Sequence, residues 1–162
     1  MGISNMPLLT ELYLAENELT SFHHLQNLPS LKKLNLRGNK IESFKDGLPD
    51  LPSLEYLNLR ENAIAEGKEL TQLCQFKRLN YLNMKGCPIS DEKGDDFRKE
   101  IIFRCEDINI TIVNKEEITQ EDRDEAAAEK EERIKAEKEA EEEAARLAAE
   151  EAEKAKEEAE DE

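Results

Sequence analysis

One eleven-residue pattern recurs four times in this chain and limits its fold more than any other feature. The pattern is L-x-x-L-x-L-x-x-N-x-L, with Ile for the last Leu in the later three copies, and the fourth copy also substitutes Met84 and Cys87. The four copies are almost evenly spaced and begin at Leu9, Leu31, Leu54 and Leu79. Such a short and regular period indicates one structural unit stacked on itself, rather than a fold closed around a single centre.

The x-L-x-L-x segment of each copy alternates with period two, as a short β-strand does. The leucines then point inward and the intervening residues point outward. The asparagines Asn17, Asn39 and Asn62 can satisfy backbone groups where each strand turns. A single unit cannot bury its apolar side, but stacked units form one continuous core. The pattern is the signature of leucine-rich repeats, and it predicts an α/β solenoid of about four repeats with a short parallel sheet on its concave side.

An amphipathic helix is the alternative explanation for closely spaced leucines. In a helix, however, Leu12 and Leu14 would lie on nearly opposite faces. Gly38 and three prolines (Pro29, Pro49 and Pro52) would also interrupt any long helix. The repeat interpretation is therefore preferred.

The segment after the fourth repeat has the pattern of an end cap. Phe97, Ile101 and Ile102 would share one face of a short helix. Alternating isoleucines then predict a last strand: Ile108, Ile110 and Ile112. This order resembles the cap of many intracellular leucine-rich-repeat proteins, in which an aromatic-Arg helix leads into a strand that ends near an Asp. Asn114 stands near the place of that Asp, and the usual Leu-Pro before the strand is missing, which leaves the strand register open.

The N-terminal end shows no comparable cap. Gly2–Leu9 aligns without a gap with His24–Leu31, so Met1 falls inside a repeat. Terminal repeats need a polar outer face to stay soluble. We therefore expect either that further repeats precede this segment in a longer protein or that a partner covers this end.

The composition changes after Asn114, which predicts two domains, 1–114 and 115–162. The second carries 22 Asp and Glu against 9 Lys and Arg, and it supplies most of the net charge of −16. Thr119 is a plausible N-cap with Asp122 three residues later, and acids in the first turn suit the helix dipole. Residues 122–162 contain no Gly or Pro and consist largely of strong helix formers. We predict a long acidic helix.

The large apolar residues of this predicted helix are few. Ile134 and Leu147, with a thin stripe of alanines, give a coiled-coil pattern that is too weak to associate alone but sufficient to lie along a preformed surface. A solvated, partly frayed or disordered tail remains the alternative.

Charge and composition exclude several function classes. An acidic chain lacks the basic charge that non-specific nucleic-acid binding requires, and it is repelled by anionic lipid. No signal peptide or membrane-spanning stretch is apparent, and three cysteines without metal-ligand spacing suggest reduced thiols in the cytoplasm. No further ligand accompanies His23 and His24, so no metal site is predicted. No catalytic or cofactor-binding motif is apparent either, and the chain is not expected to be an enzyme.

The outward strand positions are the candidate protein-binding residues. They form columns across the predicted sheet, and the last column places bases in a row beside two tyrosines. Because Tyr and Arg are favoured at binding hot spots, we hypothesise that this concave face receives an acidic helix or tail. The alternative is that the bases only keep the sheet soluble. The predicted residues are Tyr13, Lys33, Asn35, Arg37, Tyr56, Asn58, Arg60, Tyr81, Asn83 and Lys85.

Three stretches, in a fixed order along the chain, narrow the family. They are LEYLNLRENAIAEGKELTQLCQFKRLNYLNMKGCPIS, then DDFRKEIIF, then EEITQEDRDEAAAEKEERIKAEKEAEEEAARLAAEE. This order resembles the intracellular leucine-rich-repeat proteins of the ciliary axoneme, including components of the radial spoke. The resemblance implies a structural adaptor in the cytoskeleton of the cilium or flagellum, with other axonemal proteins as partners. Two nuclear alternatives stay open: acidic leucine-rich proteins that bind histones, and spliceosomal leucine-rich adaptors.

Overall fold

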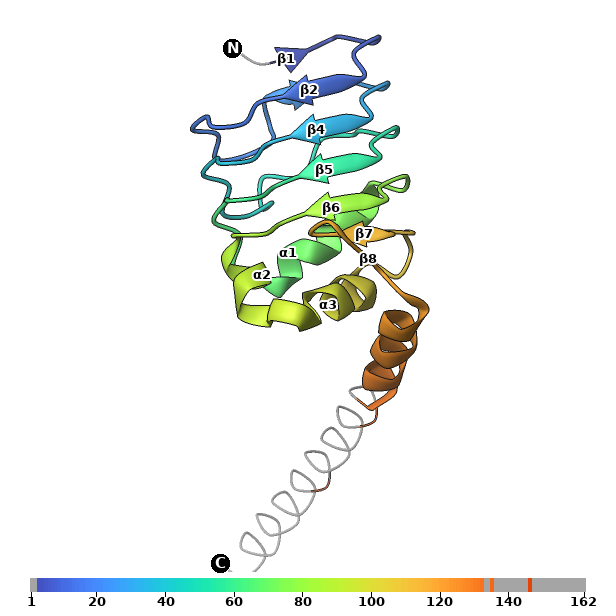
Figure 1. The fold of residues 1–162 in the computed structure, drawn as a ribbon. Helices are drawn as coiled ribbons and strands as arrows, with labels where there is room; N and C mark the ends of the chain where they lie inside the picture. The colour runs from blue at the N-terminus through green and yellow to red at the C-terminus, as the bar shows by residue number, and fades with distance from the viewer. Residues whose placement is uncertain (1–2, 133–134, 136–145, 147–162) are drawn as a thin grey trace, which may run out of the picture. The chain divides into compact units, whose positions relative to one another are not determined.

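The computed structural model describes residues 3–132, 135 and 146. The chain divides into two units, Met1–Ala126 and Ala127–Glu162. The labelled strands and helices described below all belong to the first unit (Figure 1).

Six strands form one sheet that runs along the solenoid (Figure 1). Neighbouring strands are parallel except for the last pair, β7 and β8. The register aligns equivalent repeat positions, for example Leu34 with Leu57 and Leu57 with Leu82. The predicted parallel sheet is confirmed. In spatial order the strands are β2 (Glu11–Tyr13), β4 (Lys33–Asn35), β5 (Tyr56–Asn58), β6 (Tyr81–Asn83), β7 (Ile112–Val113) and β8 (Glu116–Glu117).

A second, two-stranded sheet joins the first residues to the first repeat. β1 (Ile3–Ser4) pairs in parallel with β3 (Leu25–Gln26), with Ile3 opposite Leu25. This register equals the gapless alignment of Gly2–Leu9 with His24–Leu31, so the first residues do occupy part of a repeat. The expectation of further repeats or of a covering partner stays a prediction.

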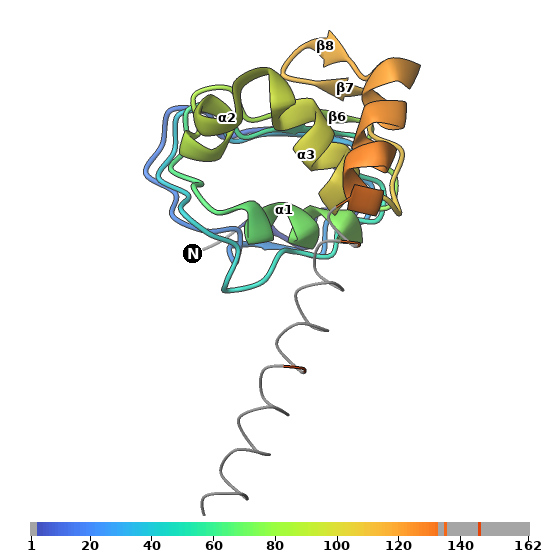
Figure 2. The ribbon, with the colours of Figure 1, turned by 90° about the horizontal axis from the view of Figure 1, so that it is seen from below.

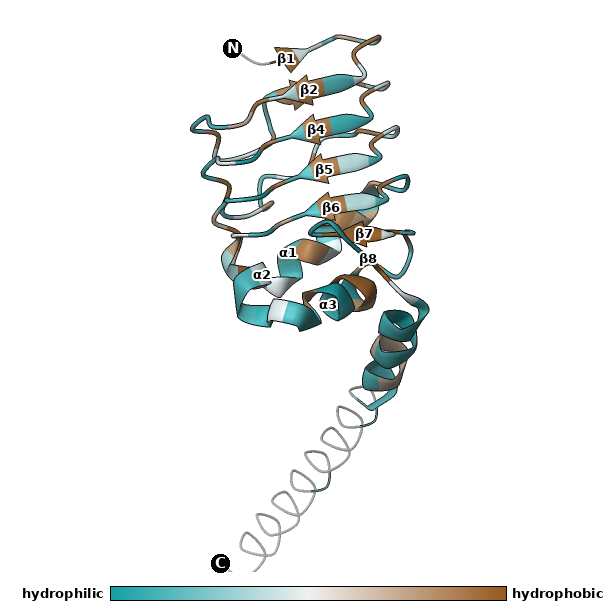
Figure 3. Ribbon diagram, in the orientation of Figure 1, coloured by the Kyte–Doolittle hydropathy of each residue, from teal (hydrophilic) through white to brown (hydrophobic). Residues whose placement is uncertain are grey.

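The core is a continuous stack of aliphatic side chains with four phenylalanines. Leucines at the repeat positions, such as Leu34, Leu57 and Leu82, are fully buried. The phenylalanines are also buried, and two of them meet edge to face with ring centroids 5.6 Å apart: Phe22 and Phe44, with Phe76 and Phe97 further along. Figure 3 shows the resulting alternation along the strands, hydrophobic at the inward leucines and hydrophilic at their neighbours.

The repeat asparagines satisfy backbone groups, as predicted. Asn62 donates through Nδ2 to the carbonyls of Leu36 (3.0 Å) and Leu59 (2.9 Å), and its Oδ1 accepts from the backbone N–H of Ile41 (3.1 Å). Asn39 bonds in the same way one repeat earlier. These bonds join neighbouring repeats to one another.

Cys87 replaces the asparagine of the fourth repeat. Its thiol donates to the carbonyl of Leu59 at 3.2 Å, and burial raises the pKa of the Cys87 thiol to about 11. A neutral thiol therefore replaces one hydrogen bond of the repeat asparagine. The asparagine ladder, the series of hydrogen bonds by which Asn39 and Asn62 join neighbouring repeats, has no asparagine in the fourth repeat.

Short helices close the far side and the end of the solenoid (Figure 2). α1 (Gly67–Gln72), continued by η1 (Leu73–Gln75), lies across the solenoid from β6, and the longer third repeat supplies its residues. α2 (Pro88–Lys93), η2 (Gly94–Asp96) and α3 (Phe97–Arg104) follow β6 at the cap end. The predicted cap helix is α3, which buries Phe97 and Ile101 and leaves Ile102 half-buried.

The last strand differs from the predicted alternation of isoleucines. Ile108 and Ile110 are buried, but Val113 rather than Ile112 continues the inward series. β7 contains only Ile112 and Val113, and a tight turn then leads to the antiparallel strand β8. Both turn residues, Asn114 and Lys115, have positive φ, as this hairpin requires. The strand register, which the sequence left open, therefore has Val113 rather than Ile112 facing the core.

The first unit also extends beyond the predicted boundary at Asn114. Ile118 packs against the core, and Ala126 is buried. Arg98 of α3 contacts both Glu116 and Asp122, and Lys99 pairs with Glu125 at 2.6 Å. The start of the acidic segment is therefore part of the cap.

The predicted helix start at Thr119 is confirmed. The Asp122 carboxylate accepts from the Thr119 backbone N–H (2.8 Å) and hydroxyl (2.9 Å), and the Asp122 N–H donates to the Thr119 hydroxyl (3.1 Å). This is a capping box, and helix follows over residues 120–132. The backbone N–H of Thr119, with Arg98 nearby, lowers the pKa of Asp122. Ile134 and Leu147 lie outside the described residues.

Candidate protein-binding face

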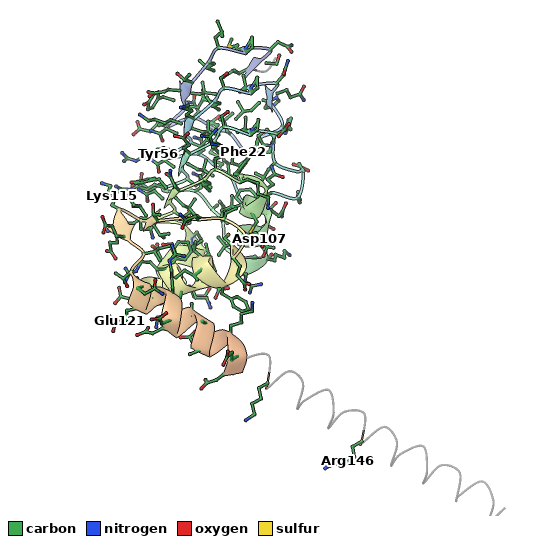
Figure 4. The ribbon with its side chains drawn as sticks, turned by 90° about the vertical axis from the view of Figure 1, so that its right-hand side faces the viewer. Phe22, Tyr56, Asp107, Lys115, Glu121 and Arg146 are labelled. Carbon is green, nitrogen blue, oxygen red and sulfur yellow. The ribbon has the colours of Figure 1, made fainter. Side chains whose placement is uncertain are left out.

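The predicted binding residues come together on the outer surface of β2, β4, β5 and β6, called the sheet face below. The strand register places Glu11, Lys33, Tyr56 and Tyr81 in one row. In Figure 4, Tyr56 marks the side of the solenoid that the sheet forms, while Phe22 belongs to the core behind it. The predicted columns therefore exist in the structure, but their members differ in what they can offer to a partner.

Two tyrosines form an aromatic platform at the centre of the sheet face. The rings of Tyr56 and Tyr81 stack with centroids 4.2 Å apart and planes 17° apart. Both are half-buried, and burial raises the pKa of Tyr56. Ile112 lies opposite Tyr81 in the next strand and is also half-buried, so the row continues as an apolar strip into the cap. This strip offers apolar surface with two phenolic hydroxyls.

The asparagine column does not offer side chains to a partner. Asn58 and Asn83 are only 8% and 3% exposed. The Oδ1 atom of each accepts from the backbone N–H two residues later, at 3.1 Å from Arg60 and 3.2 Å from Lys85. Asn35 makes the equivalent bond and is half-buried. Asn58 and Asn83 therefore present little side-chain surface, because each turns back to satisfy its own strand end.

The basic column is not a row of isolated charges. Arg37 donates from Nε to Oε2 of Glu61 at 2.8 Å, and Arg60 reaches Oε1 of the same carboxylate at 2.9 Å. The Arg37 hydrogen bond lowers the pKa of Glu61. In the first row, Lys33 pairs with Glu11 at 2.9 Å. The sheet face therefore carries bases that already hold carboxylates of this chain.

Glu61 is the functional candidate that sequence reasoning missed. Its backbone φ is positive. This left-handed conformation costs a residue with a Cβ on the order of 1 kcal/mol. Glycine stands at the equivalent position of the next repeat, Gly86, where an added Cβ would lie only 3.2 Å from Cγ of Glu61. The available signal was the alignment of Glu61 with Gly86, because a repeat position that holds glycine elsewhere is one where positive φ is expected. The Glu61 carboxylate thus joins Arg37 and Arg60 on the sheet face.

The remaining base, Lys85, borders a polar pocket at the cap end of the sheet face. The pocket has a volume of about 310 Å³, and its wall includes Asp91, Arg98, Asn114 and Glu116. Arg98 already contacts Glu116 and Asp122. Lys85 is thus positioned between the basic column and the cap.

The histidines and acids of the described residues do not form a metal site. Within residues 3–132, 135 and 146, no group of three or more His, Cys, Asp or Glu side chains could hold a metal ion. His23 and His24 lie with their ring centroids 3.9 Å apart. In the same part of the chain, no helix has the length and hydrophobicity needed to cross a membrane.

Comparisons with known proteins agree with this architecture. The sequence matches the leucine-rich repeat family over residues 5–148. It is 37% identical over 112 residues to leucine-rich repeat-containing protein 23 of Bos taurus, a match that covers 69% of this chain and 32% of that relative. The chain thus spans about a third of the length of this curated relative.

A similar solved structure is the SNF/U2A' complex of Drosophila melanogaster. Its matching chain superposes with a TM-score of 0.65 at 23% identity, over 78% of this chain and 73% of that one. At this identity the likeness concerns the fold. Leucine-rich-repeat domains mediate protein–protein interactions. The chain belongs to the leucine-rich-repeat family, and it resembles leucine-rich repeat-containing protein 23.

Proposed function

We propose that this chain is a non-catalytic structural adaptor of the ciliary radial spoke, which holds an acidic protein segment on its sheet face. The stacked pair of Tyr56 and Tyr81 carries the proposal of a binding surface. The resemblance to leucine-rich repeat-containing protein 23 supports the ciliary setting. The helix that begins after Thr119 would attach the adaptor to its assembly.

The charges of the sheet face favour an acidic partner. Lys33 lies directly opposite Tyr56, and three further bases belong to the third predicted column of the same face: Arg37, Arg60 and Lys85. The acids paired with them are Glu11 and Glu61, and Glu61 is held by two arginines at once. An incoming carboxylate can replace Glu61 between Arg37 and Arg60, because all three side chains are partly exposed. The aromatic platform then supplies the apolar contact.

Replacing Tyr81 with alanine is expected to weaken capture of the partner about thirtyfold, the equivalent of ~2 kcal/mol for a binding hot spot. The ring of Tyr81 stacks on Tyr56, so both halves of the platform are lost. The measurement is the dissociation constant for the protein that the immobilised chain retains from an axoneme extract returned to low salt. Lys77→Glu is the control, because Lys77 is exposed and lies outside the strands.

A second variant tests the charge of the partner, and it is expected to tighten binding rather than weaken it. Glu61→Gly removes the carboxylate that competes for Arg37 and Arg60 and also relieves the positive φ of Glu61. It should tighten binding of an acidic partner about fivefold, or ~1 kcal/mol. Weaker binding by Glu61→Gly would exclude the acidic partner, and full binding by Tyr81→Ala would exclude the sheet face.

Cellular fractionation tests the setting. Ciliated cells are extracted with detergent, and nuclei and axonemes are assayed separately for the chain. We expect retention in the demembranated axoneme and release at high salt, since the proposed contacts are largely ionic. Recovery in the nuclear fraction would contradict the spoke adaptor. It would favour a nuclear protein instead, either a spliceosomal adaptor, a role consistent with the fold shared with the U2A' complex, or an acidic histone-binding protein.

A further inference from the structure

Two of the three cysteines lie where the cap helix meets the far side of the third repeat. Cys74 belongs to η1, the short helix that continues α1, and Cys105 directly follows α3. Both thiols are free in the structure. Helices α1 and α3 pack against each other, although α2, η2 and the strand β6 separate them in the sequence (Figure 2). The two cysteines therefore belong to segments that only the fold brings together.

Each of these two thiols reaches the backbone close to the other cysteine. The Cys74 thiol donates to the carbonyl of Arg104 at 3.1 Å, and Arg104 directly precedes Cys105. The Cys105 thiol donates to the carbonyl of Leu70 at 3.3 Å, and Leu70 lies one helical turn before Cys74. The Leu70 carbonyl also accepts from the backbone N–H of Leu73. Because thiols are weak donors, both hydrogen bonds can be given up at small cost.

The two thiols differ in their access to solvent. Cys74 is half-buried, whereas Cys105 is only 3% exposed. Burial raises the pKa of the Cys105 thiol, and a negative charge on the neighbouring Cys74 and a hydrogen bond with it raise this pKa further. Oxidants react fastest with accessible thiols that can lose their proton. Cys74 is therefore the thiol that an oxidant reaches first, and Cys105 is a reduced thiol held beside it.

We propose that Cys74 and Cys105 form an intramolecular disulfide when the chain is exposed to a peroxide, and that this bond fixes the cap to the third repeat. In the first step, hydrogen peroxide converts the Cys74 thiol to a sulfenic acid and releases one water. In the second step, the Cys105 sulfur attacks the Cys74 sulfur, and the sulfenic hydroxyl leaves as a second water with the Cys105 proton. The two thiols together lose two electrons and two protons, which the peroxide takes up.

The disulfide would close a loop that contains β6, α2 and α3. A cross-link of this kind restricts the unfolded chain, and the restriction grows with the length of the loop. It also opposes local opening of the cap, because α3 can no longer separate from α1. The sheet face lies across the solenoid from α1 (Figure 2). The disulfide therefore changes the stability of the cap and leaves the sheet face accessible.

Oxidation of the chain should also raise its melting temperature by about 10 °C, as expected for a loop of this length in a domain of this size. The measurement is thermal unfolding followed by circular dichroism, with and without peroxide treatment. Cys74→Ser is the control, because peroxide should then leave the melting temperature unchanged. An unchanged or lower melting temperature of the disulfide-linked chain would overturn the stabilising role of the bond.

The order of the two steps is tested with Cys105→Ser. In this variant Cys74 should stop at the sulfenic acid, which dimedone labels, whereas the unchanged chain should take up little label because Cys105 consumes the sulfenic acid. Cys87→Ala removes another buried thiol and should leave the disulfide intact. If Cys105→Ser does not fold, Cys74→Ser serves instead, since its Cys105 should then survive peroxide. Equal labelling with and without Cys105, or oxidation of Cys105 without Cys74, would contradict the proposed order.

Peptide mapping without reduction tests the bond itself. Trypsin cleaves after Lys and Arg, so the three cysteines fall in separate peptides, 69–77, 86–93 and 105–115. The full chain is treated with a small molar excess of hydrogen peroxide, and free thiols are blocked with iodoacetamide before digestion. We expect peptide 69–77 linked to 105–115 in a monomeric chain, with release by dithiothreitol, while Cys87 keeps its thiol because it is 0% exposed. Three free thiols, a bond between two copies, a bond to Cys87, or Cys74 oxidised to a sulfinic acid instead would each overturn the proposal.

Discussion

Replacing Phe97 with alanine is expected to lower the free energy of unfolding by about 4 kcal/mol, within the range for truncating a buried phenylalanine. Phe97 is 1% exposed and begins α3, the helix that closes the fourth repeat. Its loss leaves a cavity between the cap and the last full repeat. Because each repeat is stabilised mainly by its neighbours, damage at the cap spreads into the solenoid. Urea denaturation followed by circular dichroism measures the change.

Phe103→Ala is the matched control for this effect. Phe103 belongs to the same helix, but it is half-buried and lies beside the Arg104 guanidinium at 5.4 Å from the ring centroid. Its truncation should cost about 1 kcal/mol, since less apolar area leaves water on folding. Equal losses for the two variants would mean that α3 does not seal the core through Phe97.

Replacing Asn62 with alanine is expected to cost about 3 kcal/mol or more, because buried polar groups lose their partner. Three backbone groups are affected: the carbonyls of Leu36 and Leu59, and the N–H of Ile41. Each unsatisfied buried group costs about 1–3 kcal/mol, and partial relaxation keeps the total below the sum. The bonds to Leu36 and Ile41 belong to the preceding repeat, so their loss also weakens stacking.

Asn17→Ala provides the comparison within the same ladder. Asn17 is exposed and donates only within its own repeat, to the carbonyls of Leu14 (2.9 Å) and Ala15 (3.1 Å). Water can replace those bonds, so the expected cost is about 1 kcal/mol or less. Thermal unfolding and urea denaturation of both variants measure the difference in their free energies of unfolding. A cost at Asn62 no larger than that at Asn17 would refute a stacking role for the ladder.

The amino-acid sequence by itself determined the repeat register. The spacing of the leucines fixes which residues face inward, because side chains in a strand alternate with period two. The same spacing placed Ile3 opposite Leu25 and put Tyr56 beside Tyr81. Local sequence was also enough to predict the helix start at Thr119, since the capping box involves residues three apart.

The tertiary structure alone decided the charge pattern of the sheet face. Glu61 contacts Arg37 of the preceding repeat, and no local sequence pattern predicts that contact. The burial of Asn58 and Asn83 likewise depends on packing between neighbouring strands rather than on side-chain polarity.

Tertiary contacts also decided the boundary of the cap. Composition changes at Asn114, but the hairpin of β7 and β8, the contacts of Arg98, and the burial of Ala126 extend the first unit to residue 126. A short acidic segment resembles a solvated tail when it is taken alone. It becomes part of the cap because α3, close in space but earlier in the chain, offers it Arg98 and Lys99. Periodicity along the chain therefore specified the solenoid, while contacts between distant residues decided how far the cap extends and how the charges of the sheet face are paired.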